Sequence, residues 1–385
     1  MTDTPRRSHG PLLLVALLAT YGSLYPFRFA VPLSIEHALR TLFAQTALWT
    51  SRGDVAGNIV LFVPIGVAIV YATNGAANYW RRAAYSMVAI AFALLLQIAQ
   101  IFVPARTAAL SDALWNGVGT FTGIALGQMV FAKLPRWSQG SDQHHHRHTI
   151  LALLVIVFWL GWRLWPFEPA LSVRQVYLAL KPMAALSSLN AWSVASMAVS
   201  LLLIAGVVHS LRFAQRWLLG AALLGLGMRF FLEGQVISLG VFVGTIVGTL
   251  AGLAVLRAGI ARAGPLVIMV AMVWYSAEAL RPFVFSALQG PMNWVPFASL
   301  LQGAMDINLA VFCGVIFLTG ALMLIGTQLR NAPGRWSVLL SAWILLLELI
   351  QQWIPTRTSD ITVALVPCAW WLALRAVQPP RRGER

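Results

Sequence analysis

Long runs of apolar residues are the feature that most constrains this chain. A helix needs about 20 mostly apolar residues to cross the hydrocarbon core of a bilayer. Only 10% of the 385 residues are charged, whereas a soluble globular protein carries about 25%. We therefore expect an all-α, polytopic transmembrane bundle with about twelve spans, near residues 11–25, 55–73, 84–103, 110–131, 149–165, 191–209, 217–232, 236–256, 265–280, 306–326, 336–353 and 361–377.

The distribution of charge predicts the orientation of these spans. If the N-terminus lies in the cytoplasm and the spans alternate, most of the 27 Lys and Arg residues fall in cytoplasmic segments, and most of the 12 acidic residues fall outside. An excess of basic residues on the cytoplasmic side is the rule for multi-pass proteins. We therefore expect both termini in the cytoplasm. The net charge of +15 is then a topology signal and an attraction to anionic lipid headgroups, and we expect no nucleic-acid partner.

Three further features favour ordinary membrane roles. The first run, from Pro11, is followed by no small-residue cleavage site, so we expect it to be retained as a span. Cys313 and Cys368 both fall in predicted spans, where small packing residues are expected and a disulfide is not. The sequence QHHHRH at residues 143–148 has no matching acidic or cysteine cluster nearby. We therefore interpret it as part of a solvated linker, and we predict no metal and no cofactor.

The sequence Leu-x-Pro-Phe closes three of the predicted spans, at Leu24–Phe27, Leu164–Phe167 and Leu280–Phe283. Proline ends a helix, and an aromatic ring suits the membrane interface. Each motif closes the first helix of a group of four, which predicts three four-helix repeats. The predicted organisation is repeat one at 11–131, a cytoplasmic His-containing linker at 132–148, a degenerate repeat two at 149–256, repeat three at 265–377 and a basic cytoplasmic tail at 378–385.

The third helices of repeats one and three share a polar pattern. Each has a Gln or Glu, a Gln three residues later and an Arg beyond a proline: Gln97, Gln100 and Arg106 in repeat one, and Glu348, Gln351 and Arg357 in repeat three. Residues three apart share a helix face, and the cost of polar groups in lipid predicts that this face points into the bundle. Other polar residues near these helix ends complete the candidate binding set, namely Asn58, Asp112, Asn116 and Asp360. Repeat two offers MRFFLEGQ, with Arg229, Glu233 and Gln235, which cannot be aligned residue by residue.

The fourth helices of repeats one and two carry glycines four residues apart, at Gly119, Gly123 and Gly127, and at Gly240, Gly244, Gly248 and Gly252. This spacing places the small residues on one helix face, where a second backbone can approach closely. We predict that these glycines are packing residues without a chemical role.

These combined motifs resemble the VanZ-like family of bacterial membrane proteins. The family pattern is an acid, a Gln, an Arg in the next turn, an Asp and then Asn-x-x-Gly, with Asn-x-x-x-Phe-x-Pro-x-Gly upstream. Repeat one has this pattern with Gln97 in place of the acid, and repeat three keeps the acid but lacks Asn-x-x-Gly. Because the family is named for a teicoplanin-resistance protein, the resemblance implies an inner-membrane protein of the cell envelope that contributes to glycopeptide or envelope-stress resistance. It implies no established reaction.

Two interpretations of the polar cluster stay open. In one, Arg, Asp and the Glu or Gln side chains form a clasp between helices. In the other, they line a periplasm-facing pocket, where Arg106 and Arg357 bind an anionic lipid, glycolipid or lipid-linked precursor, since a guanidinium matches phosphate geometry. The residues that would orient the two arginines are Asp112, Asn116, Glu348, Gln351 and Asp360.

Two other functions are alternatives. Internal repeats and acids within the membrane are typical of secondary transporters, including a lipid-carrier flippase, but these polar residues are predicted at one outer edge and not at the midplane. A membrane-embedded envelope-glycan enzyme would want a nucleophile with an oriented base or a metal cluster. We identify no catalytic residue, so the sequence favours a binding role over catalysis.

Overall fold

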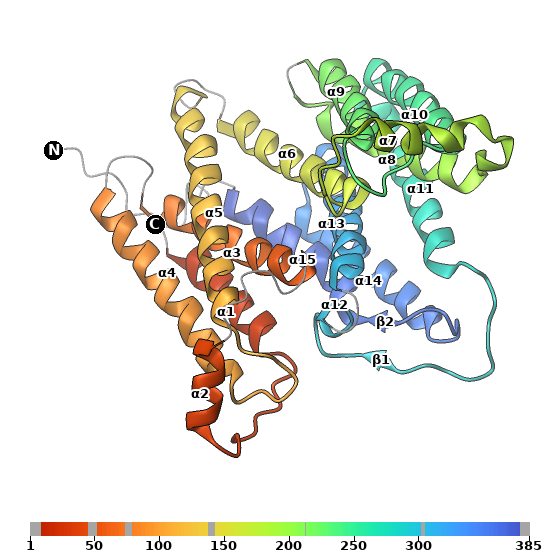
Figure 1. The fold of residues 1–385 in the computed structure, drawn as a ribbon. Helices are drawn as coiled ribbons and strands as arrows, with labels where there is room; N and C mark the ends of the chain where they lie inside the picture. Colours follow the sequence, from red (N-terminus) through yellow and green to blue (C-terminus); the bar gives the residue numbers. More distant parts are fainter. Residues whose placement is uncertain are drawn as a thin grey trace. The chain divides into compact units, whose positions relative to one another are not determined.

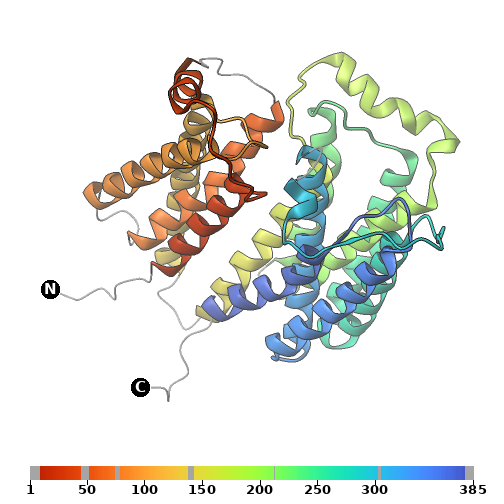
Figure 2. The same cartoon turned by 90° about the horizontal axis from the view of Figure 1, so that it is seen from below.

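The computed structural model describes residues 9–44, 52–73, 79–137, 143–211, 213–301 and 305–377. The chain divides into two compact units, residues 1–141 and 142–385, each with its own hydrophobic core. Helices dominate both units (Figures 1 and 2). The all-α class predicted from the apolar runs is therefore confirmed.

The first unit is a helical bundle built from α1 (Gly10–Leu24), α2 (Ile35–Ala44), α3 (Arg52–Ala72), α4 (Tyr79–Gln100) and α5 (Leu110–Trp137). Helices α3 and α5 run parallel in close contact, because Gly119 and Gly123 of α5 face the α3 backbone at Ile59 and Val63. A Cβ atom on Gly123 would lie 2.9 Å from the carbonyl carbon of Val63. Small residues are what let two helix backbones approach this closely.

The second unit holds the rest of the described helices and one short parallel strand pair, which Figure 1 labels. Its elements are α6 (Gln143–Leu164), α7 (Val173–Leu180), η2 (Lys181–Ala184), η3 (Leu186–Ser188), α8 (Ala191–Val208), α9 (Ala214–Gly227), η4 (Met228–Phe230), α10 (Leu239–Ala258), α11 (Ile260–Leu280), β1 (Met292–Asn293), α12 (Ala298–Leu301), α13 (Met305–Leu329), α14 (Pro333–Gln351), β2 (Ser359–Asp360) and α15 (Ile361–Val377).

Helix α13 lies at the centre of this unit. Its residues 322–325 are all buried, which is expected only of a helix that is surrounded on every side. Glycines on α13 leave room for large rings from its neighbours: a Cβ on Gly314 would lie 3.0 Å from the Trp162 ring of α6, and one on Gly326 would lie 2.5 Å from the Trp336 ring of α14. Tryptophan rings thus fill the space that the missing side chains leave.

Helices α8 and α10 lie side by side in the same unit (Figure 1). Three of the glycines that were predicted to pack, Gly240, Gly244 and Gly248, face the α8 backbone, and a Cβ on Gly244 would lie 2.6 Å from the carbonyl oxygen of Val194. Further along, a Cβ on Gly248 would lie 2.7 Å from Cα of Ala198. The contact between these two helices therefore follows the same principle as the contact between α3 and α5.

Each predicted apolar run coincides with a helix, but the helices differ in their ability to cross a membrane. Among the described residues, six are long and apolar enough to do so, and four more apolar helices have only 10–17 described residues. The six long helices are Tyr79–Gln100, Ala191–Val208, Leu239–Ala258, Ile260–Leu280, Asn308–Leu329 and Pro333–Gln351. These helices support the prediction of a membrane protein. The twelve spans and the three four-helix repeats stay predictions.

The structure describes only part of the predicted linker and none of the predicted tail. Helix α5 continues to Trp137 and α6 begins at Gln143, so helical backbone enters the predicted linker from both sides. Residues 138–142 and the basic tail at 378–385 lie outside the described residues. The short elements α2, α7, α12, β1 and β2 lie between the predicted spans, and none has an apolar run of membrane length.

Candidate functional site

In the first unit, the polar residues at the end of α4 hold neighbouring helix ends. Gln97 is buried, and its Oε1 accepts a hydrogen bond of 3.1 Å from the amide of Ala109, just before α5 begins. Gln100 is also buried, and its Nε2 donates to the carbonyl of Ser23 in α1 at 3.0 Å. A buried amide without partners would be costly. These two bonds give each buried glutamine a partner and connect the end of α4 to α1 and to the residue before α5.

Arg106 closes the end of α1. Its Nε donates to the carbonyl of Tyr25 at 3.1 Å, and its Nη2 donates to the carbonyl of Gly22 at 3.0 Å. The last carbonyls of a helix have no partner within the helix, and the negative end of the helix dipole favours a cation there. Arg106 therefore acts as a helix cap donated from a distant part of the chain.

Arg357 makes the same arrangement in the second unit. Its Nε donates to the carbonyl of Arg281 at 2.9 Å, and its Nη2 donates to the carbonyl of Glu278 at 2.5 Å. In both units the two acceptors are three residues apart, and one of them directly precedes the proline of Leu-x-Pro-Phe. The two arginines that the sequence analysis paired thus occupy matching positions.

Glu348 corresponds to Gln97 in the same way. Its Oε2 accepts a hydrogen bond of 2.9 Å from the amide of Asp360, which is 12 residues further along, as Ala109 is from Gln97. Only an acceptor oxygen is used in either case, and a carboxylate and an amide both provide one. Gln97 stands where the resembled family pattern has an acid, and it still accepts the same backbone hydrogen bond.

In the region predicted to be repeat two, residues that do not align with the other two supply comparable contacts. Gln235 donates from Nε2 to the carbonyl of Trp165, the residue before the proline, at 2.9 Å. Arg229 donates from Nη2 to the carbonyl of Arg163 at 3.2 Å, and from Nη1 to Oε1 of Gln235 at 3.0 Å. Arg229 and Gln235 together donate to the carbonyls at the end of α6, whereas a single arginine does so at the ends of α1 and α11. The spacing of residues in the sequence does not predict this.

Asp360 joins three elements of the second unit. Its Oδ1 accepts from the amide of Thr362 at 2.7 Å, at the start of α15, and its Oδ2 accepts from the amide of Ser299 at 3.0 Å, in α12. The hydroxyl groups of both residues also donate to it, and Asp360 pairs with Asn293 where β1 meets β2. Ser299 in turn accepts at its carbonyl from Asn308 at 2.8 Å. The sequence analysis selected Asp360 as a candidate binding residue but missed Ser299 and Thr362, because these two residues are not part of any motif that it used.

The other predicted site residues occupy less defined positions. Gln351 is buried, while Asn58 and Asp112 are half-buried, with Asp112 in the first turn of α5. Asn116 is 1% exposed, and its Oδ1 has no hydrogen-bond partner within the described part of the chain. The structure therefore brings together Gln97, Gln100 and Arg106 in the first unit, and Glu348, Arg357 and Asp360 in the second.

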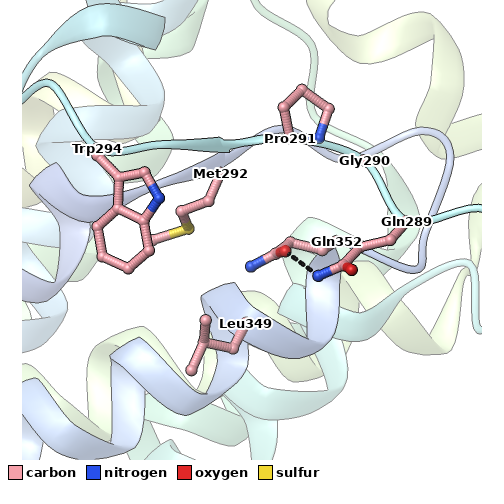
Figure 3. Close-up of a pocket in the computed structure, with 7 residues that line it drawn as sticks. All are labelled: Gln289, Gly290, Pro291, Met292, Trp294, Leu349 and Gln352. Atoms are coloured by element: carbon pink, nitrogen blue, oxygen red, sulfur yellow. Dashed lines mark hydrogen bonds between the residues drawn. The ribbon is translucent and has the colours of Figure 1, made fainter.

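A cavity of about 550 Å³ opens beside the end of α14 (Figure 3). Its lining carries no charged side chain and consists of Gln289, Gly290, Pro291, Met292, Trp294, Leu349 and Gln352. The amide of Gly290 donates to the carbonyl of Gln352 at 2.7 Å, and Nε2 of Gln289 donates to Oε1 of Gln352. These bonds hold the segment that begins at Gln289 against the end of α14. The volume of the cavity is within the range of small-molecule pockets. The sequence analysis selected none of these residues.

The apolar helices fit a membrane protein, and polar side chains from distant parts of the chain cap its helix ends. Residues 11–132 match the VanZ/LLP1 family model. This match lies within the first unit and supports the VanZ-like resemblance predicted from the motifs. Comparisons with curated proteins and with solved structures gave no match.

Proposed function

We propose that this VanZ-like protein binds an anionic lipid or glycolipid of the cell envelope, at the helix ends that Arg106 and Arg357 cap. In this proposal the protein lies in the bacterial inner membrane with both termini in the cytoplasm, and both arginines face the periplasm. Binding would contribute to resistance against glycopeptides such as teicoplanin or against envelope stress. The VanZ-like match and the apolar helices support the membrane and family parts of this proposal.

The observation that carries the proposal is the way each guanidinium is held. A guanidinium has five N–H donors in a planar fork, and both arginines use the Nε and Nη2 edge for main-chain carbonyls. Nη1 of Arg357 makes no hydrogen bond to the part of the chain that the structure describes, and the side chain is half-buried. A preorganised cation with donors to spare suits a phosphate or phosphodiester group.

The uncharged cavity supports a glycolipid as the ligand. Its opening lies beside Gln352, five residues before Arg357 in the chain. Amide groups offer both donors and acceptors, and the Trp294 ring offers an apolar face with a polar edge. This lining suits the hydroxyl groups and ring faces of a sugar, while Arg357 would bind the anionic group.

The capping bonds also stabilise the fold, so the test must separate the two roles. We would replace Arg106 and Arg357 by Gln in one variant, with Arg335→Gln as a control, because Arg335 is exposed at the opposite end of α14. Loss of glycopeptide tolerance in the double variant, at an unchanged level of protein in the membrane, would support the proposal. Wild-type tolerance in the double variant would refute it.

A further inference from the structure

The segment between α6 and α8 has its polarity reversed relative to a water-facing surface element. Its apolar side chains point outward: Leu171 is 83% exposed, Val173 is 87%, Tyr177 is 62% and Leu186 is 82%. A soluble surface helix buries its apolar stripe and exposes its polar one. Large exposed apolar side chains recur along residues 171–189, interrupted by exposed Ser172, Arg174, Lys181 and Ser187, and a water-facing loop would not favour so many.

Several polar groups of the same segment bond inward to the protein. Gln175 of α7 is buried, and its Nε2 donates to the carbonyls of Leu232 at 2.6 Å and Gln235 at 3.2 Å. The amide of Ile237 donates to the carbonyl of Ala179 at 2.8 Å, and Ser188 accepts from the amide of Leu239 at 3.0 Å. These bonds fix α7 and η3 onto the segment between α9 and α10, so the outward face is held in place and is not a flexible surface.

The helix α7 therefore has three distinct sides. With 3.6 residues per turn, Gln175 and Ala179 share the side that faces the protein, and Val173 and Tyr177 share an apolar side. The two basic residues, Arg174 and Lys181, are exposed on a third side, about a quarter of a turn from the apolar one. An apolar side next to a basic side is the pattern of a helix that lies in the plane of a membrane interface.

We propose that residues 171–189 form an interfacial anchor, in which the apolar side of α7 and Leu186 enter the lipid of the leaflet where α6 ends. Arg174 and Lys181 would lie at the level of anionic headgroups, where long basic side chains keep their charge in water while their stems contact lipid. The occupant of this surface is thus the bilayer itself. The inference depends on the membrane location of α6 and α8 and does not require that the protein handles a lipid ligand.

The test uses spin labels on the full-length protein in lipid nanodiscs. Single cysteines would replace Val173, Tyr177 or Leu186, in a background where Cys313 and Cys368 are changed to Ser. Leu250→Cys, on the exposed face of α10, which is long and apolar enough to cross a membrane, serves as the hydrocarbon reference. Asn331→Cys, in the exposed turn before α14, serves as the aqueous reference. Because all of these side chains except the two native cysteines are exposed, the labels should not disturb the core.

Collision rates with oxygen and with a water-soluble nickel chelate decide the outcome. The anchor predicts that labels at the three positions collide with oxygen in preference to nickel, as the Leu250 label does, and that a label at Arg174 gives an intermediate ratio. Preference for nickel at the level of Asn331 would overturn the inference, because the segment would then face water. Low collision with both reagents would also overturn it, because another protein surface or a second copy would then cover the segment.

Discussion

Replacing Gly244 by Ala tests whether the close contact between α8 and α10 depends on the absence of a side chain at this position. The new Cβ would lie 2.6 Å from the carbonyl oxygen of Val194 and 3.0 Å from Cβ of Met197. Ordinary contact begins at 3.4 Å, so α8 and α10 would have to separate by roughly 0.8 Å at the oxygen. Because the obstacle is backbone, a change of side-chain rotamer cannot relieve it.

The matched control is Gly220→Ala on α9, in the same unit, where a Cβ would meet nothing within 4 Å. Both changes gain about 0.5–1 kcal/mol of helix propensity, so this gain cancels in the comparison. The difference between the two variants is then the overpacking cost, about 1–3 kcal/mol. We expect Gly220→Ala to be neutral or slightly stabilising and Gly244→Ala to be the less stable variant by that amount.

The assay is reversible unfolding of the purified protein in mixed micelles with increasing SDS, followed by circular dichroism. Equal midpoints for the two alanine variants would refute the reasoning, because the close approach of α8 and α10 would then have no energetic consequence. A loss with Gly220→Ala alone would be equally damaging, since that position has open space around it.

Three further predictions follow from the contacts described above. Gln235→Leu should lower the stability of the second unit by about 1–3 kcal/mol, because the carbonyl of Trp165 loses its donor, whereas Gln215→Leu at an exposed position should change the SDS midpoint little. Trp294→Ala should weaken binding of a glycosylated detergent, measured by calorimetry, without lowering the unfolding midpoint, since Trp294 is 64% exposed; unchanged binding would exclude the cavity. Leu288→Cys should react with a membrane-impermeant thiol reagent in intact cells and Asn331→Cys only after lysis, and the reverse pattern would contradict the proposed orientation.

The sequence predicted the matching positions of Arg106 and Arg357 but not what they contact. Their offsets from Gln97 and Glu348 are local, and such a pattern is visible in a linear sequence. The carbonyls that they cap are 76 to 84 residues away in the chain. Packing between helices decides which helix end each arginine reaches. Residues close to the arginine in the sequence do not reveal that packing.

Two other features show where sequence reasoning ends. Arg229 and Gln235 replace the single capping arginine with two side chains, so an alignment by spacing cannot detect them. The outward apolar side of α7 gives no signal in a search for spans, because its eight residues are too short to form a membrane-length apolar run. In both cases the contacts that define the role come from the segment between α9 and α10.

The most direct test of the central claim is native mass spectrometry of lipids that stay bound to the protein. Wild type and Arg335→Gln should retain an anionic phospholipid such as phosphatidylglycerol in preference to phosphatidylethanolamine. Arg357→Gln should lose that preference while still binding lipid, because the guanidinium at the end of α11 supplies the anion contact. If Arg357→Gln keeps the wild-type preference, the arginine is a helix cap and no more, and the proposed function fails.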